Sequence, residues 1–255
     1  MARFYLNAPL SVGQTIDLPP DIIRHLQVLR IREHEVIQLF NGNGSEYEAT
    51  LSNLNKKQAA ALVIKKNEQW SQTSQNKISL AIGLIANDKM DLVIQKATEL
   101  GVKEIIPLYS KYAQRISSER LNKRMEHWQS IIISSCMQCG QNYIPTICMP
   151  ILYEELLNDT GKYNLKLILS PREVDAANPQ KRHEQEVGLD WDVTKSLDIT
   201  HALLMVGAEG GWSNLEVTEA IKQGFIPVKL GELILRAETA VIAGISLLNV
   251  KLKIW

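Results

Sequence analysis

The residues best suited to chemistry lie near the C-terminus, in two glycine-containing stretches that each follow a short apolar run. The first stretch, GAEGGW at 207–212, follows the run 201–206, and the second, GELILRAETA at 231–240, follows the run 226–230. Three glycines in five positions allow a sharp turn and let a ligand lie against bare main chain. If both runs are buried strands, the two loops lie at the C-terminal ends of neighbouring parallel strands, where open α/β sheets bind ligands.

Helices and strands that could position these loops can be read along residues 77–255. Ser213 and Glu216 have the spacing of a capping box, which predicts a helix that ends near Gly224. A last helix is expected over about 238–253. Upstream, the pattern predicts a strand at 77–85, a helix that Asn87 or Asp88 caps, and a strand at 104–109, which together form a βαβ unit. Further predictions are a long helix from 117 or 118 to about 140, a strand at 166–170 and a solvated loop over 172–200, whose His183 is only a weak catalytic candidate.

Residues 1–70 read as a small β-rich domain, followed by a polar linker at 71–76. The Asn-Gly pair at 41–42 separates two strand-like runs and is a strong hairpin signal. A helix is expected from about 19 to 30, near a basic cluster of Arg24, His25, Arg30 and Arg32. This cluster is either a solvated surface or a set of phosphate contacts.

Composition restricts the class of protein. The 255 residues include 28 basic and 28 acidic side chains, so the net charge of zero argues against non-specific coating of nucleic acid. No apolar run reaches membrane-spanning length, and the N-terminus does not resemble a signal peptide, so a cytoplasmic protein is expected. Cys136 and Cys139 form a C-x-x-C pair without a second such pair; we expect packing thiols rather than a metal site.

The paired motifs VGAEGGWSNLE and LGELILRAETA resemble the signature of the RsmE family. Two further segments, HLQVLRIREHEVIQLFNGNGSEYEATL and KMDLVIQKATELGVKEIIPL, also resemble this family, so the likeness extends over most of the chain. The resemblance implies an α/β fold: a PUA-like RNA-binding β-barrel at 1–70 and, at 77–255, a SPOUT α/β-knot domain with a mainly parallel sheet and a deep trefoil knot. It also implies a homodimer that methylates N3 of a uridine in 16S ribosomal RNA with S-adenosylmethionine.

Under this resemblance the glycine loops hold the cofactor, because their main-chain groups can read the adenine edge and the ribose while apolar side chains form a wall. The expected cofactor residues are Ser170, Gly207, Glu209, Gly210, Gly211, Leu230, Gly231, Ile234, Leu235, Glu238, Thr239 and Ala240.

Two residues are expected to take part in catalysis. A positive charge near the uracil would favour loss of the N3 proton, so Arg236 is the first candidate, for this role or for gripping phosphate. Glu209 is a weaker candidate for the general base. Glu238 is expected to support the last helix or a loop amide. The expected RNA contacts are Arg3, Arg24, His25, Arg30, Arg32, Lys89 and Arg124.

Three positions depart from the family pattern. Gln141 replaces a common Arg, Ala208 replaces the usual Pro, and Leu233 replaces the usual Arg. These departures keep two alternatives open, which are an RNA-binding scaffold that has lost catalysis and a related knot enzyme that acts on transfer RNA.

Overall fold

The computed structural model describes residues 1–55, 57–67, 77–170 and 199–254. The predicted linker at 71–76 and almost all of the predicted loop at 172–200, with His183, lie outside these residues. The chain divides into two compact units: the first combines Met1–Gln75 with Ile133–Ile144, and the second combines Asn76–Ile132 with Pro145–Trp255.

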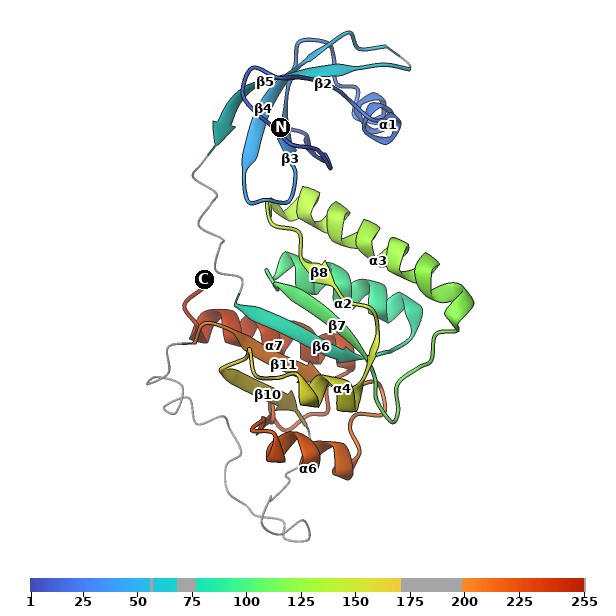
Figure 1. Cartoon of the computed structure of the whole chain (residues 1–255), viewed down its shortest axis with the longest axis vertical. Coiled ribbons are helices and arrows are strands. Elements are labelled where there is room, and N and C mark those ends of the chain that lie inside the picture. Colours follow the sequence, from blue (N-terminus) through green and yellow to red (C-terminus); the bar gives the residue numbers. More distant parts are fainter. Residues whose placement is uncertain (56, 68–76, 171–198, 255) are drawn as a thin grey trace. The chain divides into compact units, whose positions relative to one another are not determined.

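The first unit is built on a five-stranded sheet in the order β1-β3-β4-β5-β2. Within the described residues no pairing joins β1 to β2, so the PUA-like barrel expected from sequence takes the form of a curled half-barrel sheet. The hairpin predicted at Asn41-Gly42 is confirmed, because Phe40 pairs with Glu46 in antiparallel β3 and β4. The elements are β1 (Arg3–Tyr5), β2 (Thr15–Asp17), α1 (Pro20–Val28), β3 (Val36–Phe40), β4 (Glu46–Ser52) and β5 (Ala60–Asn67) (Figure 1).

The second unit alternates strands and helices, and the βαβ unit predicted over 77–109 is confirmed by the parallel pairing of β6 with β7. Its elements are β6 (Ile78–Gly83), α2 (Asn87–Glu99), β7 (Glu104–Tyr109), α3 (Ser118–Cys139, whose last turns belong to the first unit), β8 (Thr146–Ile147), β9 (Ile151–Leu152), α4 (Tyr153–Asn158), β10 (Leu165–Leu169), β11 (Ala202–Val206), α6 (Asn214–Lys222), β12 (Ile226–Val228) and α7 (Ala237–Lys251).

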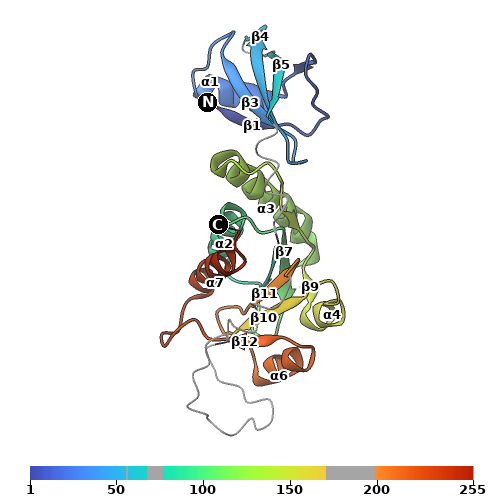
Figure 2. The ribbon, with the colours of Figure 1, turned by 90° about the vertical axis from the view of Figure 1, so that its left-hand side faces the viewer.

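The sheet of the second unit is parallel, in the order β12-β10-β11-β6-β7-β8, with β9 also paired to β7. Every residue of β6 and β11 is buried, as expected for central strands of a parallel sheet covered on both faces. Helices α2 and α7 lie on one face and α4 and α6 on the other (Figure 2). One expectation is wrong: β11 and β12 are not neighbours, because β10 lies between them.

The N-cap residues of two helices show where the local sequence pattern was sufficient to predict the structure and where it was not. The capping box at α6 is confirmed, since Ser213 Oγ accepts from the Glu216 amide while the Glu216 carboxylate accepts from the Ser213 amide at 2.7 Å. Helix α2, in contrast, has Ala86 as its N-cap residue, so neither Asn87 nor Asp88 caps it. The partner of the Ala86 amide comes from a distant segment, described below.

The end of α3 packs into the first unit around Arg3. The guanidinium forms an ion pair with Glu46 (Nε to Oε2, 3.3 Å), donates to the Gln141 carbonyl at 2.9 Å, and also contacts the Cys136 carbonyl and the Asn142 side chain. Only 7% of the Arg3 side chain is exposed. Arg3 therefore braces this segment, and the structure does not place it at an RNA-facing surface.

The C-x-x-C pair lies in the last turn of α3, as the sequence predicts. Burial raises the pKa of the Cys136 thiol to about 12, so this thiol is protonated at neutral pH. Among the described residues, no group of three His, Cys, Asp or Glu side chains is placed to hold a metal ion. Within the same ranges, no helix combines the length and the apolar character that a membrane crossing requires.

Candidate functional site

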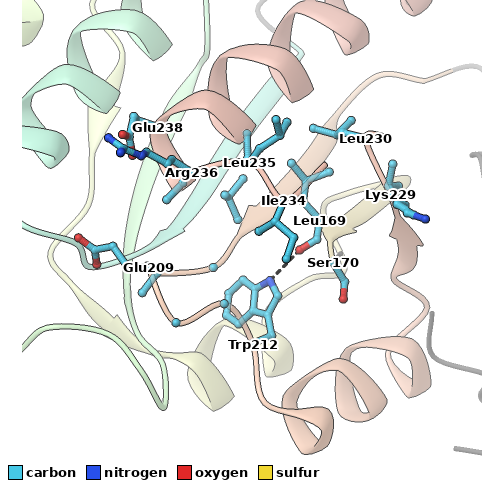
Figure 3. A pocket seen from close by; sticks show the side chains of 18 of the residues that line it. Leu169, Ser170, Glu209, Trp212, Lys229, Leu230, Ile234, Leu235, Arg236 and Glu238 are labelled. Atoms are coloured by element: carbon cyan, nitrogen blue, oxygen red, sulfur yellow. Dashed lines mark hydrogen bonds between the residues drawn. The ribbon is translucent and has the colours of Figure 1, made fainter. Parts of the chain in front are cut away.

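A cavity of about 670 Å³ lies at the C-terminal ends of β12, β10 and β11 (Figure 3). Every residue predicted to bind a cofactor lines it except Thr239, which is exposed on the first turn of α7. Because β10 stands between the other two strands, its last residue, Leu169, and the following Ser170 lie between the two glycine loops. The cavity is lined by Lys89, Leu169, Ser170, 206–212, 228–231, 233–238 and Ala240.

The first loop folds back on itself immediately after β11. The Gly211 amide donates to the Ala208 carbonyl at 2.8 Å, and Gly211 has φ +69°, a conformation that favours glycine. A Cβ on Gly207 would lie only 2.9 Å from the Gly211 carbonyl carbon. The turn therefore depends on glycine at positions 207 and 211, and the Ala208 carbonyl accepts the hydrogen bond that closes it.

The wall of the cavity next to this loop is aromatic. The indole Nε1 of buried Trp212 donates to the Leu169 carbonyl at 3.1 Å, which ties the glycine loop to the end of β10 (Figure 3). The Trp212 ring also packs against Tyr153, with ring centroids 5.5 Å apart. Trp212 and Leu169 were not among the site residues predicted from sequence. The available signals were that Trp212 directly follows Gly211 and that Leu169 is the last residue of a strand.

The second loop supplies the opposite, aliphatic part of the cavity. Leu230 and Leu235 are half-buried, and Gly231 between them has φ +131°. Leu233 and Ile234 line the cavity but are 83% and 84% exposed. This rim is therefore an open apolar surface, and the departure at Leu233 adds to it.

The end of the cavity near α2 is charged. The Glu209 carboxylate accepts from the Ala86 amide at 3.1 Å and lies 3.4 Å from the Lys89 ammonium. It thus provides the partner that the α2 N-terminus lacks locally. Burial alone would raise the pKa of Glu209, but the hydrogen bonds from the Ala86 and Glu209 amides and the charge of Lys89 hold it below its ordinary value.

Arg236 and Glu238 lie side by side at the start of α7, on the same side of the cavity as Glu209 (Figure 3). Arg236 is the N-cap residue of α7 and is exposed; among the described residues no carboxylate is within ion-pair distance of its guanidinium. Glu238 has one buried oxygen, Oε2, without a hydrogen-bond partner. A buried, unpaired carboxylate oxygen is costly, and a ligand donor would relieve it.

The residues predicted to contact RNA are distributed over both units. In the first unit Arg24, His25, Arg30 and Arg32 are all exposed, in or just after α1. In the second, Lys89 lines the cavity. Arg124 is half-buried on α3. Gln141 belongs to the first unit, where its carbonyl accepts from Arg3, and it is not among the residues that line the cavity.

A second polar cluster lies at the opposite, N-terminal ends of β6 and β7. The Glu104 carboxylate accepts from Ser79 Oγ at 3.1 Å, from the Tyr163 hydroxyl at 3.1 Å and from Lys162 at 3.3 Å. Burial alone would raise the pKa of Glu104, but the Lys162 charge and these hydrogen bonds hold it below the ordinary range. The cluster satisfies buried polar groups and takes no part in the cavity.

The chain combines one unit built on a parallel sheet, whose strand ends and glycine loops line a cavity, with a second unit built on a curled sheet. This is the architecture of a two-domain α/β enzyme, and two family models match it. Residues 71–249 match the RNA methyltransferase domain family, and residues 18–64 match the RNA methyltransferase PUA domain family. The chain thus has the architecture of an RNA methyltransferase with a PUA domain.

Similar proteins narrow the class. The ribosomal RNA small subunit methyltransferase E of Buchnera aphidicola subsp. Schizaphis graminum is 33% identical over 98% of this chain and 96% of its own length. The chain belongs to the family of ribosomal RNA small subunit methyltransferase E proteins. A solved structure of the Neisseria gonorrhoeae enzyme of this name, bound to S-adenosyl methionine, is 37% identical, covers 98% of this chain and 97% of its own, and has a TM-score of 0.84. A putative Legionella pneumophila methyltransferase in complex with the same cofactor is 32% identical over 97% and 96% of the two chains, with a TM-score of 0.80.

Proposed function

We propose that this protein methylates N3 of a specific uridine in 16S ribosomal RNA of the small subunit, with S-adenosylmethionine as methyl donor. The observation that carries the proposal is the cavity at the ends of β12, β10 and β11, which joins bare glycine main chain, an apolar wall and a charged end. Relatives of the same architecture bind this cofactor.

The cavity has the properties that the cofactor requires. Its volume of about 670 Å³ is within the range of pockets for drug-sized ligands. A Cβ at Gly207 would meet main chain, and the unpaired Oε2 of Glu238 is available to a ligand donor. Adenosine can lie against Leu230, Leu235 and the Trp212 side, with its polar edges toward the loops' peptide groups.

The charged end is where the uracil is acted upon. S-adenosylmethionine supplies an electrophilic methyl group when bound. Arg236 favours the N3-deprotonated ring through its positive charge, since an opposite charge stabilises the ionised form. The Glu209 geometry favours a positioning role over the general-base role expected from sequence, because its carboxylate already holds the α2 N-terminus and its pKa is lowered.

Two measurements test the function. Calorimetry with S-adenosylmethionine should show binding; no heat would support an RNA-binding scaffold without catalysis. Small subunits from a strain that lacks this protein should accept methyl groups at uridine N3. If mapping instead placed the modified base in transfer RNA, the protein would be a related enzyme with that substrate.

Arg236→Ala should abolish turnover and spare cofactor binding, whereas Lys222→Ala, an exposed change on α6, should alter neither. Unchanged turnover in Arg236→Ala would remove this residue from the mechanism.

The exposed apolar side chains around the second loop and the α2 and α7 helices support a homodimer. Leu233, Ile234 and, on α7, Ile242 and Val250 are exposed, as is Leu92 on α2. A second copy would cover this surface and bring the open rim of the cavity next to a subunit interface. Light scattering should give twice the mass of the chain, and Ile242→Lys should shift it toward the monomer; a wild-type monomer would refute this assembly.

We assign RNA docking to the domain at 1–70 and catalysis to the domain at 77–255, in a cytoplasmic protein. The exposed cluster of Arg24, His25, Arg30 and Arg32 supports the docking role. Arg24→Glu with Arg30→Glu should weaken subunit binding and lower its salt dependence, because phosphate contacts release counterions. Unchanged salt dependence would contradict this assignment.

A further inference from the structure

Tyr112 is an exposed aromatic residue beside the first glycine loop, in the segment between β7 and α3. A Cβ placed on Gly210 would lie 2.8 Å from the Tyr112 Cβ and 3.0 Å from its Cγ, so the tyrosine packs directly against this glycine. Nevertheless 48% of Tyr112 is exposed. Gly210 lines the cavity and follows Glu209 of its charged end, so Tyr112 packs against a cavity residue, although it is not itself among the lining residues.

The segment that carries Tyr112 is also basic. The Lys111 ammonium lies 5.5 Å from the Tyr112 ring centroid, and the Arg115 guanidinium lies 4.9 Å from that of Tyr109. Arg120 and Lys123 follow on the first turns of α3 and are exposed. Within the part of the chain that the structure describes, none of these four cations forms an ion pair with a carboxylate. They are free to meet phosphates, while the flexible Lys111 stem can move away from the ring.

We propose that Tyr112 stacks on the target uracil and that Lys111 and Arg115 hold the phosphates beside it. This inference rests on the proposed function. A base that presents N3 to a cavity must leave its neighbours in the RNA, which costs stacking energy. RNA-binding proteins commonly replace this lost stacking with an aromatic side chain. Tyr112 combines the position, the exposure and the adjacent positive charge that this role needs.

Leucine and phenylalanine at position 112 separate stacking from packing. Leucine keeps a Cβ and an apolar branch against Gly210 but has no π-face, whereas phenylalanine keeps the ring. Base stacking on an aromatic residue corresponds to a change of about 5- to 150-fold in affinity. Tyr112→Leu should therefore lower kcat/KM for unmodified small subunits by about this factor. Tyr112→Phe should stay within about twofold, and both variants should bind S-adenosylmethionine as the wild type does.

A second measurement does not depend on methyl transfer. Fluorescence anisotropy with a labelled uridine decamer should show weaker binding by the full-length Tyr112→Leu variant than by the wild type and Tyr112→Phe. Equal affinities and equal kcat/KM would overturn the proposal. A parallel loss of cofactor affinity in Tyr112→Leu would also overturn it, because Tyr112 would then only brace the glycine loop. If the wild type transfers no methyl group, the proposed function fails, and the decamer measurement still decides the role of Tyr112.

Discussion

Adding one methyl group at position 207 should damage the cofactor site more than it damages the fold. In Gly207→Ala the new Cβ would lie 2.9 Å from the Gly211 carbonyl carbon, 3.0 Å from its Cα and 3.1 Å from its oxygen. Carbon atoms in favourable contact are about 3.5–4.0 Å apart, and these atoms are backbone that cannot rotate away. Relief requires opening the turn that the Gly211–Ala208 hydrogen bond closes.

The size of the effect follows from the cost of overpacking, typically about 1–3 kcal/mol. If the cofactor requires the closed turn, Gly207→Ala should raise the Kd for S-adenosylmethionine by about 5- to 150-fold, at 1.4 kcal/mol per factor of ten. The fold of the sheet should persist, because β11 ends at Val206, one residue before the substitution. Calorimetry measures the Kd, and circular dichroism follows the thermal transition.

Gly161→Ala is the matched control. Gly161 has no left-handed φ, and nothing lies within 4 Å of an added Cβ. This variant should keep the wild-type Kd and gain stability by up to about 1 kcal/mol, because alanine restricts the unfolded chain. The reasoning would be refuted if Gly207→Ala bound the cofactor as tightly as Gly161→Ala.

Three further outcomes can be measured. Trp212→Phe removes the indole donor to the buried Leu169 carbonyl and should destabilise the protein by about 1–3 kcal/mol, measured by urea denaturation; no loss would show that this bond is dispensable. The folded pKa of Glu209 is depressed below its ordinary 4.5. The contacts of its carboxylate with the Ala86 amide and Lys89 are therefore complete above that pH and are lost on acidification below it. The rate should therefore show no acid limb from Glu209 between about pH 6 and 8, and a limb there that vanishes in Glu209→Gln would restore it as general base. The folded pKa of Glu104 is also depressed, so the stability that this carboxylate contributes is present above pH 4.5 and is lost as the pH falls through the folded pKa. Glu104→Gln should therefore lower the Tm at pH 7 more than at pH 3.5. An equal decrease at both pH values would contradict the ion pair with Lys162.

Local patterns predicted much of the fold. The capping box at Ser213, the Asn-Gly hairpin and the βαβ unit at 77–109 each depend on residues close in sequence, and each is present. Most of the residues predicted to bind the cofactor line the cavity for the same reason, since two glycine stretches mark two strand ends. Their expected roles stay predictions, and so does the trefoil knot, which only the family resemblance implies.

The features that sequence did not reveal depend on distant segments. The order of strands follows from packing, so the insertion of β10 between β11 and β12 could not be read from spacing. Likewise the partner of the Ala86 amide comes from Glu209, more than a hundred residues later. Arg3 looked like a surface cation because its ion-pair partner Glu46 and its carbonyl acceptors lie on other elements.

The packing of 133–144 around Arg3 means that no single cut of the chain separates the two units. The polypeptide changes unit after residues 75, 132 and 144. A fragment that starts at Lys77 would keep α3 but lose the guanidinium that the Cys136 and Gln141 carbonyls accept from. The amino-terminal domain therefore supplies hydrogen bonds that stabilise the end of that helix, and an excised catalytic half should be prone to fraying and aggregation there.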